Sequence, residues 1–396
     1  MKLYHFSHNR QVNSRFILLL LVLAVGIPWA PTQAAVTATN CVTQSDIPPD
    51  ECYALLALYD STDGPNWLNN TGWNVTNSPC SWFGVGCSGG KVQSVALPDN
   101  RLNGTIPDIP AAGPATFDGL EYLNLNSNQL NGSIPNLSML TSLQTLNLSD
   151  NQLDGSIPSL SALTNLVELR LDYNQLSGNI PALSTLTNIQ IVWLENNQLN
   201  GSIPNLSTLT SLQVLILSTN QLDGSIPDLS TLNNLVALSL DGNQLSGNIP
   251  ALSALTNIQI LWLQHNQLSG YIPELSTLTN LRSLDLMDNQ LDGSIPNLSA
   301  LSMVRRISLS GNQLSGGIPD LSDLTNLQYL DVSNNRLSGA IPDLSALSFL
   351  SYLYLENNQL DSQVPTSVCQ ATAALDIGYN KLVPLFKNKQ HDIMTT

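Results

Sequence analysis

The sequence predicts an α/β-type solenoid, in which a short strand and the bend that follows it are repeated many times along one axis. Three observations support this fold class. The pattern LxxLxLxxNxLxGxIP recurs from Leu120 onward, its asparagine returns every 23 residues from Asn128 to Asn358, and leucine alternates with other residues as in a strand. Because stacked turns share one continuous core, the 396 residues do not require several globular domains.

Residues 1–35 are typical of an export signal. Three Lys and Arg residues precede a run of twelve apolar residues at 16–27, and residues 32–34 form a small-residue cleavage site. The alternative is an uncleaved anchor, but twelve helical residues rise only about 18 Å against a hydrocarbon core of about 30 Å. No later stretch resembles a transmembrane segment, so we expect a secreted or cell-surface protein, periplasmic or extracellular in a bacterium.

The charge of the chain narrows its partners. Without residues 1–35, ten Lys and Arg face 29 Asp and Glu, which gives a net charge of −19. Nucleic acid is a poor partner because phosphate binding needs clustered Lys and Arg, and an anionic membrane would repel the chain. A protein, above all a basic one, or a neutral carbohydrate fits better, and we expect a monomer.

Residues 36–92 are predicted to form an N-terminal cap. A solenoid needs such a cap because the leucines of its first turn have no neighbour on one side. Residues 49–59 form a helix candidate that begins with prolines and acidic residues and gathers its apolar residues on one face, namely Ala54, Leu55, Leu58 and Tyr59. We expect this face to lie on the first strand.

The segment PCSWFGVGC then resembles the N-terminal cap of plant-type leucine-rich-repeat proteins. Its motif PCxWxGVxC matches from Pro79 to Cys87. With an export signal in front, this implies a disulfide between Cys80 and Cys87, with Cys41 and Cys52 as the second pair, although four cysteines allow three connectivities. A zinc site is the competing interpretation, but the CxxC pairs and histidine ligands of such sites are absent, so we expect no metal.

The LxGxIP element is also the hallmark of the plant-type subclass. The resemblance covers roughly residues 50–382 and implies a right-handed superhelix with one long parallel concave β-sheet and a second short sheet at LxGxIP. The LSxLTxL segments would form short helical or 3₁₀ turns on the convex side. Relatives by resemblance include receptor ectodomains, polygalacturonase-inhibitor-like proteins and exported bacterial proteins with the same cap. They imply ligand binding through the concave face, without catalysis.

Each repeat, within residues 93–382, can be interpreted chemically. The asparagine is expected to hydrogen-bond backbone groups of the neighbouring turn that would otherwise be buried and unpaired. The glycine permits a backbone conformation closed to other residues, and the proline ends strand pairing. The first repeat carries five extra residues in a surface loop at 108–119.

The last repeat departs from the pattern, since Asn380 follows Asn358 after 22 residues. Cys369 has no obvious partner, and we expect a buried thiol, with an intermolecular bridge as the alternative. Residues 383–396 form an irregular tail.

A longer period is superimposed on the first. Residues 166–234 and 235–303 are near copies, 69 residues or three repeats apart. Block duplication is the simplest explanation.

The outward strand positions are the candidate binding residues. Six of them form an apolar patch whose two tryptophans stand three strands apart, roughly 14 Å at about 4.8 Å per strand. Such patches commonly mark interaction sites, although one chance patch copied by the duplication is the alternative. The six are Ile191, Trp193, Val214, Ile216, Ile260 and Trp262.

A second candidate group combines tyrosines with acids near the end of the repeats. Amphipathic tyrosines beside carboxylates suit a sugar or a basic protein, and an ordinary solvated face is the alternative. The group consists of Tyr329, Asp331, Tyr352 and Tyr354, with Glu356 and Asp376 beside them.

The sequence offers little for catalysis. His265 and His391 are the two histidines after residue 35, and no HExxH, GxSxG or P-loop pattern occurs. We therefore predict an exported recognition protein, without enzymatic activity or cofactor, that binds a protein or glycan through the concave face. The alternatives are an inhibitor of a secreted polysaccharide-degrading enzyme and a structural or adhesive cell-surface protein.

Overall fold

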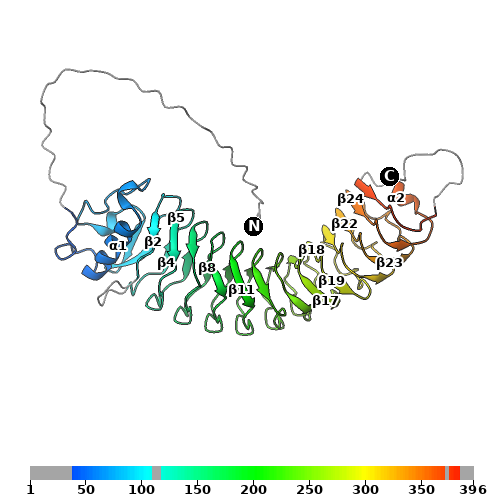
Figure 1. Cartoon of the computed structure of the whole chain (residues 1–396), viewed down its shortest axis with the longest axis horizontal. Helices are drawn as coiled ribbons and strands as arrows, with labels where there is room; N and C mark the ends of the chain where they lie inside the picture. The colour runs from blue at the N-terminus through cyan, green and yellow to red at the C-terminus, as the bar shows by residue number, and fades with distance from the viewer. Residues whose placement is uncertain (1–37, 109–116, 371–373, 384–396) are drawn as a thin grey trace, which may run out of the picture. The chain divides into compact units, whose positions relative to one another are not determined.

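The computed structural model describes residues 38–108, 117–370 and 374–383 (Figure 1). The predicted export signal, the tail from residue 384 and the side chain of Cys369 lie outside this description. Among the residues described, no helix is long and apolar enough to cross a membrane.

The predicted solenoid is confirmed by a sheet of fourteen strands that follows the concave side of the stacked turns (Figure 1). Only its first pair, β1 (Val85–Ser88) and β2 (Lys91–Ala96), is antiparallel. Every later strand is three residues of LxxLxL. The later strands are β4 (Tyr122–Asn124), β6 (Thr145–Asn147), β8 (Glu168–Arg170), β10 (Ile191–Trp193), β12 (Val214–Ile216), β14 (Ala237–Ser239), β16 (Ile260–Trp262), β18 (Ser283–Asp285), β20 (Arg306–Ser308), β22 (Tyr329–Asp331), β24 (Tyr352–Tyr354) and β26 (Ala374–Asp376).

The LxGxIP elements form further parallel strands, but in four separate sheets of three. The central strands of these sheets begin 69 residues apart, so the three-repeat period of the sequence reappears in the pairing. The sheets comprise β3 (Asn103–Thr105), β5 (Gln129–Ser133) and β7 (Gln152–Asp154); β9 (Ser177–Asn179), β11 (Gln198–Ser202) and β13 (Gln221–Asp223); β15 (Ser246–Asn248), β17 (Gln267–Tyr271) and β19 (Gln290–Asp292); and β21 (Ser315–Gly316), β23 (Arg336–Gly339) and β25 (Gln359–Leu360).

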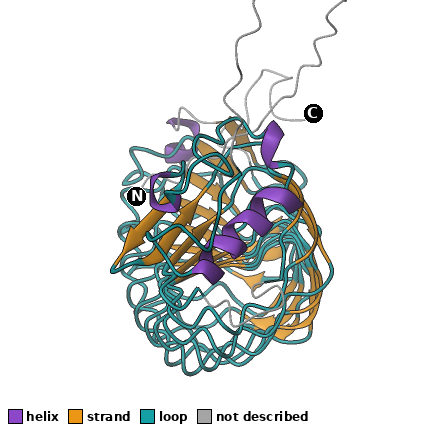
Figure 2. Ribbon diagram, turned by 90° about the vertical axis from the view of Figure 1, so that its left-hand side faces the viewer, coloured by secondary structure: helices purple, strands orange, loops and turns teal. Residues whose placement is uncertain are grey.

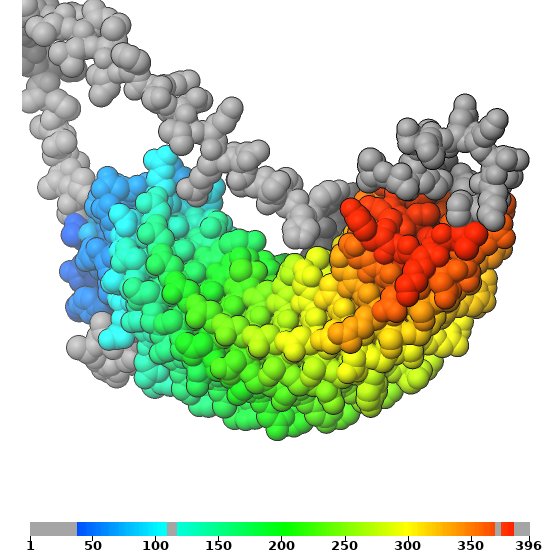
Figure 3. Space-filling model, turned by 45° about the vertical axis from the view of Figure 1, so that its right-hand side comes forward, coloured from blue at the N-terminus to red at the C-terminus, as the bar shows by residue number. Residues whose placement is uncertain are grey.

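The LSxLTxL segments run along the convex side as hydrogen-bonded turns. In each, two successive backbone bonds span three residues, as from Leu140 N–H to the Leu137 carbonyl (2.9 Å) and from Leu143 N–H to the Leu140 carbonyl (3.0 Å). These are single turns with 3₁₀-type bonds, too short to continue as helices. The leucines they carry are buried, and the stacked turns form one continuous surface (Figure 3).

The recurring asparagine has the role predicted for it. The Asn289 side chain donates to the carbonyls of Leu263 (3.0 Å), Leu286 and Met287 (both 3.2 Å) and accepts from the backbone N–H of Leu268 (3.0 Å). Two of these partners belong to the preceding turn. Each such asparagine therefore joins two turns and pairs backbone groups that the core would otherwise bury without partners.

The cap covers the first turn, as predicted. Helix α1 (Pro49–Ser61) lies across the end of the stack (Figure 2) and buries the apolar face that includes Leu55 and Leu58. The Glu51 carboxylate accepts a hydrogen bond of 2.7 Å from Val92 N–H, which ties the helix to β2. Four aromatic rings pack behind the helix with neighbouring centroids 5.0 to 6.1 Å apart, namely those of Tyr59, Trp67, Trp73 and Trp82.

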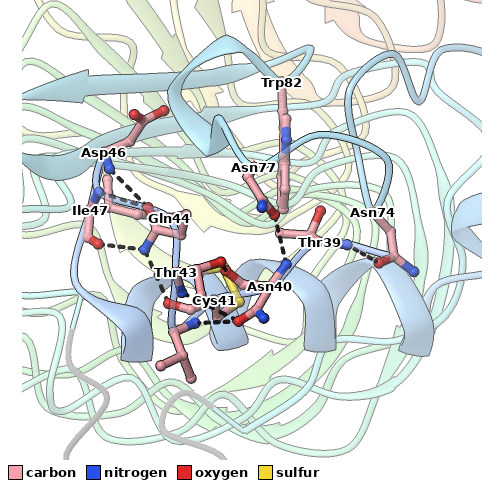
Figure 4. The surroundings of a disulfide bond; sticks show 12 residues. Thr39, Asn40, Cys41, Thr43, Gln44, Asp46, Ile47, Asn74, Asn77 and Trp82 are labelled. Atoms are coloured by element: carbon pink, nitrogen blue, oxygen red, sulfur yellow. Dashed lines mark hydrogen bonds between the residues drawn. A yellow bond between two sulfur atoms is a disulfide. The ribbon is translucent and has the colours of Figure 1, made fainter. Parts of the chain in front are cut away.

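Two disulfides hold the cap together. Cys80 is bonded to Cys87, and Cys41 to Cys52 on α1, each with Cα atoms 5.5 Å apart. Around the second bond, Asn40 N–H donates to the Asn77 side chain at 2.7 Å (Figure 4). The chain entering the cap is thus held to both α1 and the segment that follows it, which includes two short 3₁₀ helices, Gly64–Asn66 and Pro79–Ser81.

The last turn keeps the pattern in spite of its altered sequence. A five-residue helix, α2 (Thr366–Gln370), stands where the earlier repeats have a turn. Asn380 still donates to the Leu355 carbonyl (2.9 Å) and accepts from Leu360 N–H (3.1 Å). The shorter spacing to Asn380 is therefore absorbed without loss of the asparagine bonds.

Candidate ligand-binding face

The strand register places the predicted apolar residues in two straight rows. Trp193, Ile216, Ser239 and Trp262 pair successively in one row. Ile191, Val214, Ala237 and Ile260 pair in the other. The six predicted residues are therefore neighbours, and we call them the tryptophan strip.

The tryptophan strip is half-buried along its whole length. Its large side chains shield one another, and they cover the two small residues of the middle strand, Ala237 and Ser239, which are 5% and 2% exposed. The strip is thus an apolar surface with a low point at β14. Whether it binds a ligand stays a prediction.

The two tryptophans have different surroundings although their local sequences are near copies. Trp262 donates its indole N–H to the Ser283 hydroxyl at 2.9 Å. The position equivalent to Ser283 beside Trp193 is Val214, which offers no acceptor, and the buried Trp193 Nε1 has no hydrogen-bond partner. The Arg170 guanidinium lies 4.8 Å from the Trp193 ring centroid and forms an ion pair with Glu168.

Carboxylates border the Trp193 end of the strip, and sequence reasoning overlooked them. Asp172 and Glu195 follow β8 and β10 directly, two residues before their asparagines. One carboxylate oxygen of Asp172 is buried without a hydrogen-bond partner. Burial, with contributions from Glu195 and Asp150, raises the pKa of Asp172 to about 7. A search of all outward positions, two residues before each asparagine included, would have found this pair.

The raised pKa of Asp172 predicts a pH-dependent stability. Because the folded chain holds this proton up to about pH 7 and the unfolded chain releases it near pH 4, the folded state loses stability as pH rises between these values. We expect Asp172→Asn to stabilise the protein at pH 8 by on the order of 2 to 4 kcal/mol and to have little effect at pH 4. Thermal unfolding at both pH values measures this.

Asp154→Asn is the matched control, since Asp154 is an exposed residue of an outer sheet. It should leave the melting temperature unchanged at either pH. An equal gain from Asp172→Asn at pH 4 and pH 8 would contradict the assigned pKa.

The structure also brings the tyrosine group together. The Tyr329 ring centroid lies 5.8 Å from those of both Tyr352 and Tyr354, and the Tyr329 hydroxyl donates to Asp331 at 3.3 Å. The prediction missed Arg306, whose guanidinium lies 3.9 Å from the Tyr329 centroid, and its partner Asp285 (3.2 Å). Both occupy outward strand positions next to the tyrosines, which is the signal that could have found them.

These contacts change the interpretation of the tyrosine group. Asp331 also accepts from Ser310 (3.0 Å) and Ser333 (2.7 Å), so its oxygens already have partners within the chain. Of the two acids beside the group, Glu356 has a pKa raised by burial, and exposed Asp376 accepts from Gly378 N–H at 2.8 Å. The group is largely satisfied internally, and its role as a ligand site stays a prediction.

Two other features were searched for a site. A depression of about 300 Å³ lies at the start of the central strands, lined by Gln213, Asn234, Val236, Asn257, Gln259 and Asn280. Its asparagines donate to carbonyls of the preceding turn, as Asn257 does to Asn233 (2.8 Å). Within the described ranges, no three His, Cys, Asp or Glu side chains gather as a metal-binding set.

Protein families match both the cap and the repeats. Residues 48–88 match the family described as leucine rich repeat N-terminal domain. Leucine rich repeat matches residues 119–139, 142–163 and 165–186. Leucine rich repeats (2 copies) matches residues 256–300, 302–345 and 325–365.

Curated relatives and solved structures include plant receptors. Receptor-like kinase TMK4 of Arabidopsis thaliana is 34% identical over 128 residues, which are 32% of this chain and 11% of the kinase. A TDR receptor structure is 34% identical, with a TM-score of 0.65, over 67% of this chain and 48% of the receptor. The Arabidopsis receptor kinase HAESA, solved with the peptide hormone IDA and the co-receptor SERK1, is 29% identical with a TM-score of 0.60, over 85% and 65% of the two chains.

The chain therefore spans about half of the TDR receptor structure and a small part of the kinase.

Proposed function

Because the chain is a leucine-rich-repeat protein with the N-terminal cap of that family, we propose that it is an exported, non-catalytic recognition protein that binds a polypeptide. The tryptophan strip on the concave face is the proposed contact surface. The observation that carries the proposal is the register that aligns Trp193, Ile216 and Trp262 in one apolar row.

Physical reasons favour this surface. Tryptophan and aliphatic side chains supply most of the binding energy at protein interfaces, and the low point at β14 leaves space for a ligand side chain between larger neighbours. The similarity to HAESA, whose structure holds a peptide hormone, supports a polypeptide ligand. The two disulfides suit an oxidising, extracellular environment.

A random peptide library selected on the purified protein tests the proposal. We expect recovered peptides to lose at least about tenfold in affinity for the double variant Trp193→Ala/Trp262→Ala, because one buried aromatic contact is commonly worth 1 kcal/mol or more. Calorimetry measures the loss. Tyr271→Ala is the matched control, since Tyr271 is an exposed aromatic residue of an outer sheet, and it should change nothing.

Peptides that bind the double variant as tightly as the unaltered protein would overturn the proposed surface. Saturable binding of a glycan array, with no peptide recovered, would overturn the polypeptide ligand.

A further inference from the structure

The duplicated blocks carry the same apolar pair in different electrostatic surroundings. Ile191 and Trp193 of the first copy correspond to Ile260 and Trp262 of the second, 69 residues on. The neighbouring outward positions differ in charge. The first copy has Asp150, Glu168, Arg170 and Glu195 where the second has Thr219, Ala237, Ser239 and Gln264.

The Trp193 end carries a local excess of negative charge. The charge of Arg170 is matched by Glu168, with which it is paired. Three further carboxylates, Asp150, Asp172 and Glu195, lie close enough together that the other two raise the pKa of Asp172. No such group of acids surrounds Trp262 at the equivalent positions, where Asp241 accepts from the Ser218 hydroxyl at 2.6 Å.

We propose that the strip distinguishes the two ends of one extended peptide: a Lys or Arg side chain lies at the Trp193 end against Asp172 and Glu195, and a neutral apolar side chain lies at Trp262. This inference rests on the proposed function and names its ligand class. Charge complementarity selects the basic residue, and the apolar surroundings of Trp262 select its neighbour. An aromatic ring beside carboxylates is also a favourable environment for a cation.

The spacing of the two ends sets the spacing within the peptide. Three strand steps separate Trp193 from Trp262, about 14 Å at about 4.8 Å per step. An extended chain advances about 3.3 Å per residue, so the basic and apolar residues should lie about four positions apart. A free amino acid or a short dipeptide cannot reach both ends.

The titration of Asp172 adds a pH dependence to the same geometry. Asp150, Arg170, Tyr173 and Glu195 are the charged and titratable groups that face Asp172, and burial raises its pKa to about 7. A bound cation favours the ionised carboxylate, so affinity should be higher at pH 8 than at pH 6, by up to about tenfold.

The test compares peptides selected on the protein with the same peptides after substitution. Peptides from the random library should carry Lys or Arg about four positions from an apolar residue. Replacing that basic residue by norleucine should cost about tenfold in affinity for the unaltered protein. It should cost less than about twofold for the double variant Asp172→Asn/Glu195→Gln. Asp241→Asn, at the equivalent place beside Trp262, is the matched control and should keep the full tenfold dependence.

The outcomes separate this inference from the proposed function. Peptides that need Trp193 and Trp262 but show no preference for Lys or Arg would overturn the inference and leave the proposed function standing. Peptides whose affinity is independent of both tryptophans, or a library without a binder, would overturn both. Circular dichroism of each variant confirms that it is folded before binding is compared.

Discussion

Replacing Asn289 by alanine should lower the free energy of unfolding by about 3 to 5 kcal/mol. The substitution leaves the Leu268 N–H and the Leu263 carbonyl without the asparagine side chain that pairs them, and each unpaired buried group costs about 1 to 3 kcal/mol. Asn289 is itself buried between two turns, so water does not readily replace its amide. Urea denaturation followed by circular dichroism measures the loss.

Gln290→Ala is the matched control for Asn289→Ala. It removes a neighbouring amide that is exposed on β19, and it should change stability by less than about 0.5 kcal/mol. Because repeat stability is a sum over turns and their interfaces, the Asn289 variant should also unfold in two steps, the turns on either side separating. Equal stability of the two variants would contradict the bridging role of Asn289.

Replacing Trp73 by alanine should remove about 3 to 5 kcal/mol from the cap. Trp73 is fully buried, with ring centroids of Trp67 and Trp82 each 5.0 Å away, and its indole N–H donates to the Phe83 carbonyl at 2.8 Å. The substitution leaves a large cavity and an unpaired carbonyl. Since the cap covers the first leucines, we expect the solenoid to open from this end.

Hydrogen exchange shows where the Trp73 variant opens. Protection should fall in residues 85–125 and persist in residues 283–360, because each turn contacts only its neighbours. Phe83→Ala, at a partly exposed aromatic residue of the same cap, is the control and should leave protection unchanged. A uniform loss of protection along the whole chain would contradict opening from the cap.

Most of the fold could be predicted because the repeat constrains every turn in the same way. The spacing of Asn289 from Asn266 and Asn312 makes these residues neighbours in adjacent turns, and a buried amide between turns has few partners other than backbone. The cap followed from the motif at Cys80 and Cys87 and from the helix pattern before it. The break of the outer sheets into threes was not predicted, because LxGxIP is nearly the same in every repeat.

The candidate face was predictable only in part. The rows of Trp193 and Trp262 follow from the period, and the structure has them in the register that the period implies. The partners of Tyr329 were not evident, because whether Arg306 turns toward Tyr329 and Asp285 or toward solvent depends on the packing of three adjacent strands.

The sequence by itself determined the solenoid, the asparagine bonds between turns and the capped first turn. These depend on a period of 23 residues, which makes the same neighbours in every turn whatever the side chains around them. Only the tertiary structure decided that Trp262 has an acceptor while Trp193 has none, and that Asp172 holds its proton to about pH 7. Burial and the nearest charges come from side chains of adjacent turns, and they differ even where the repeat is copied.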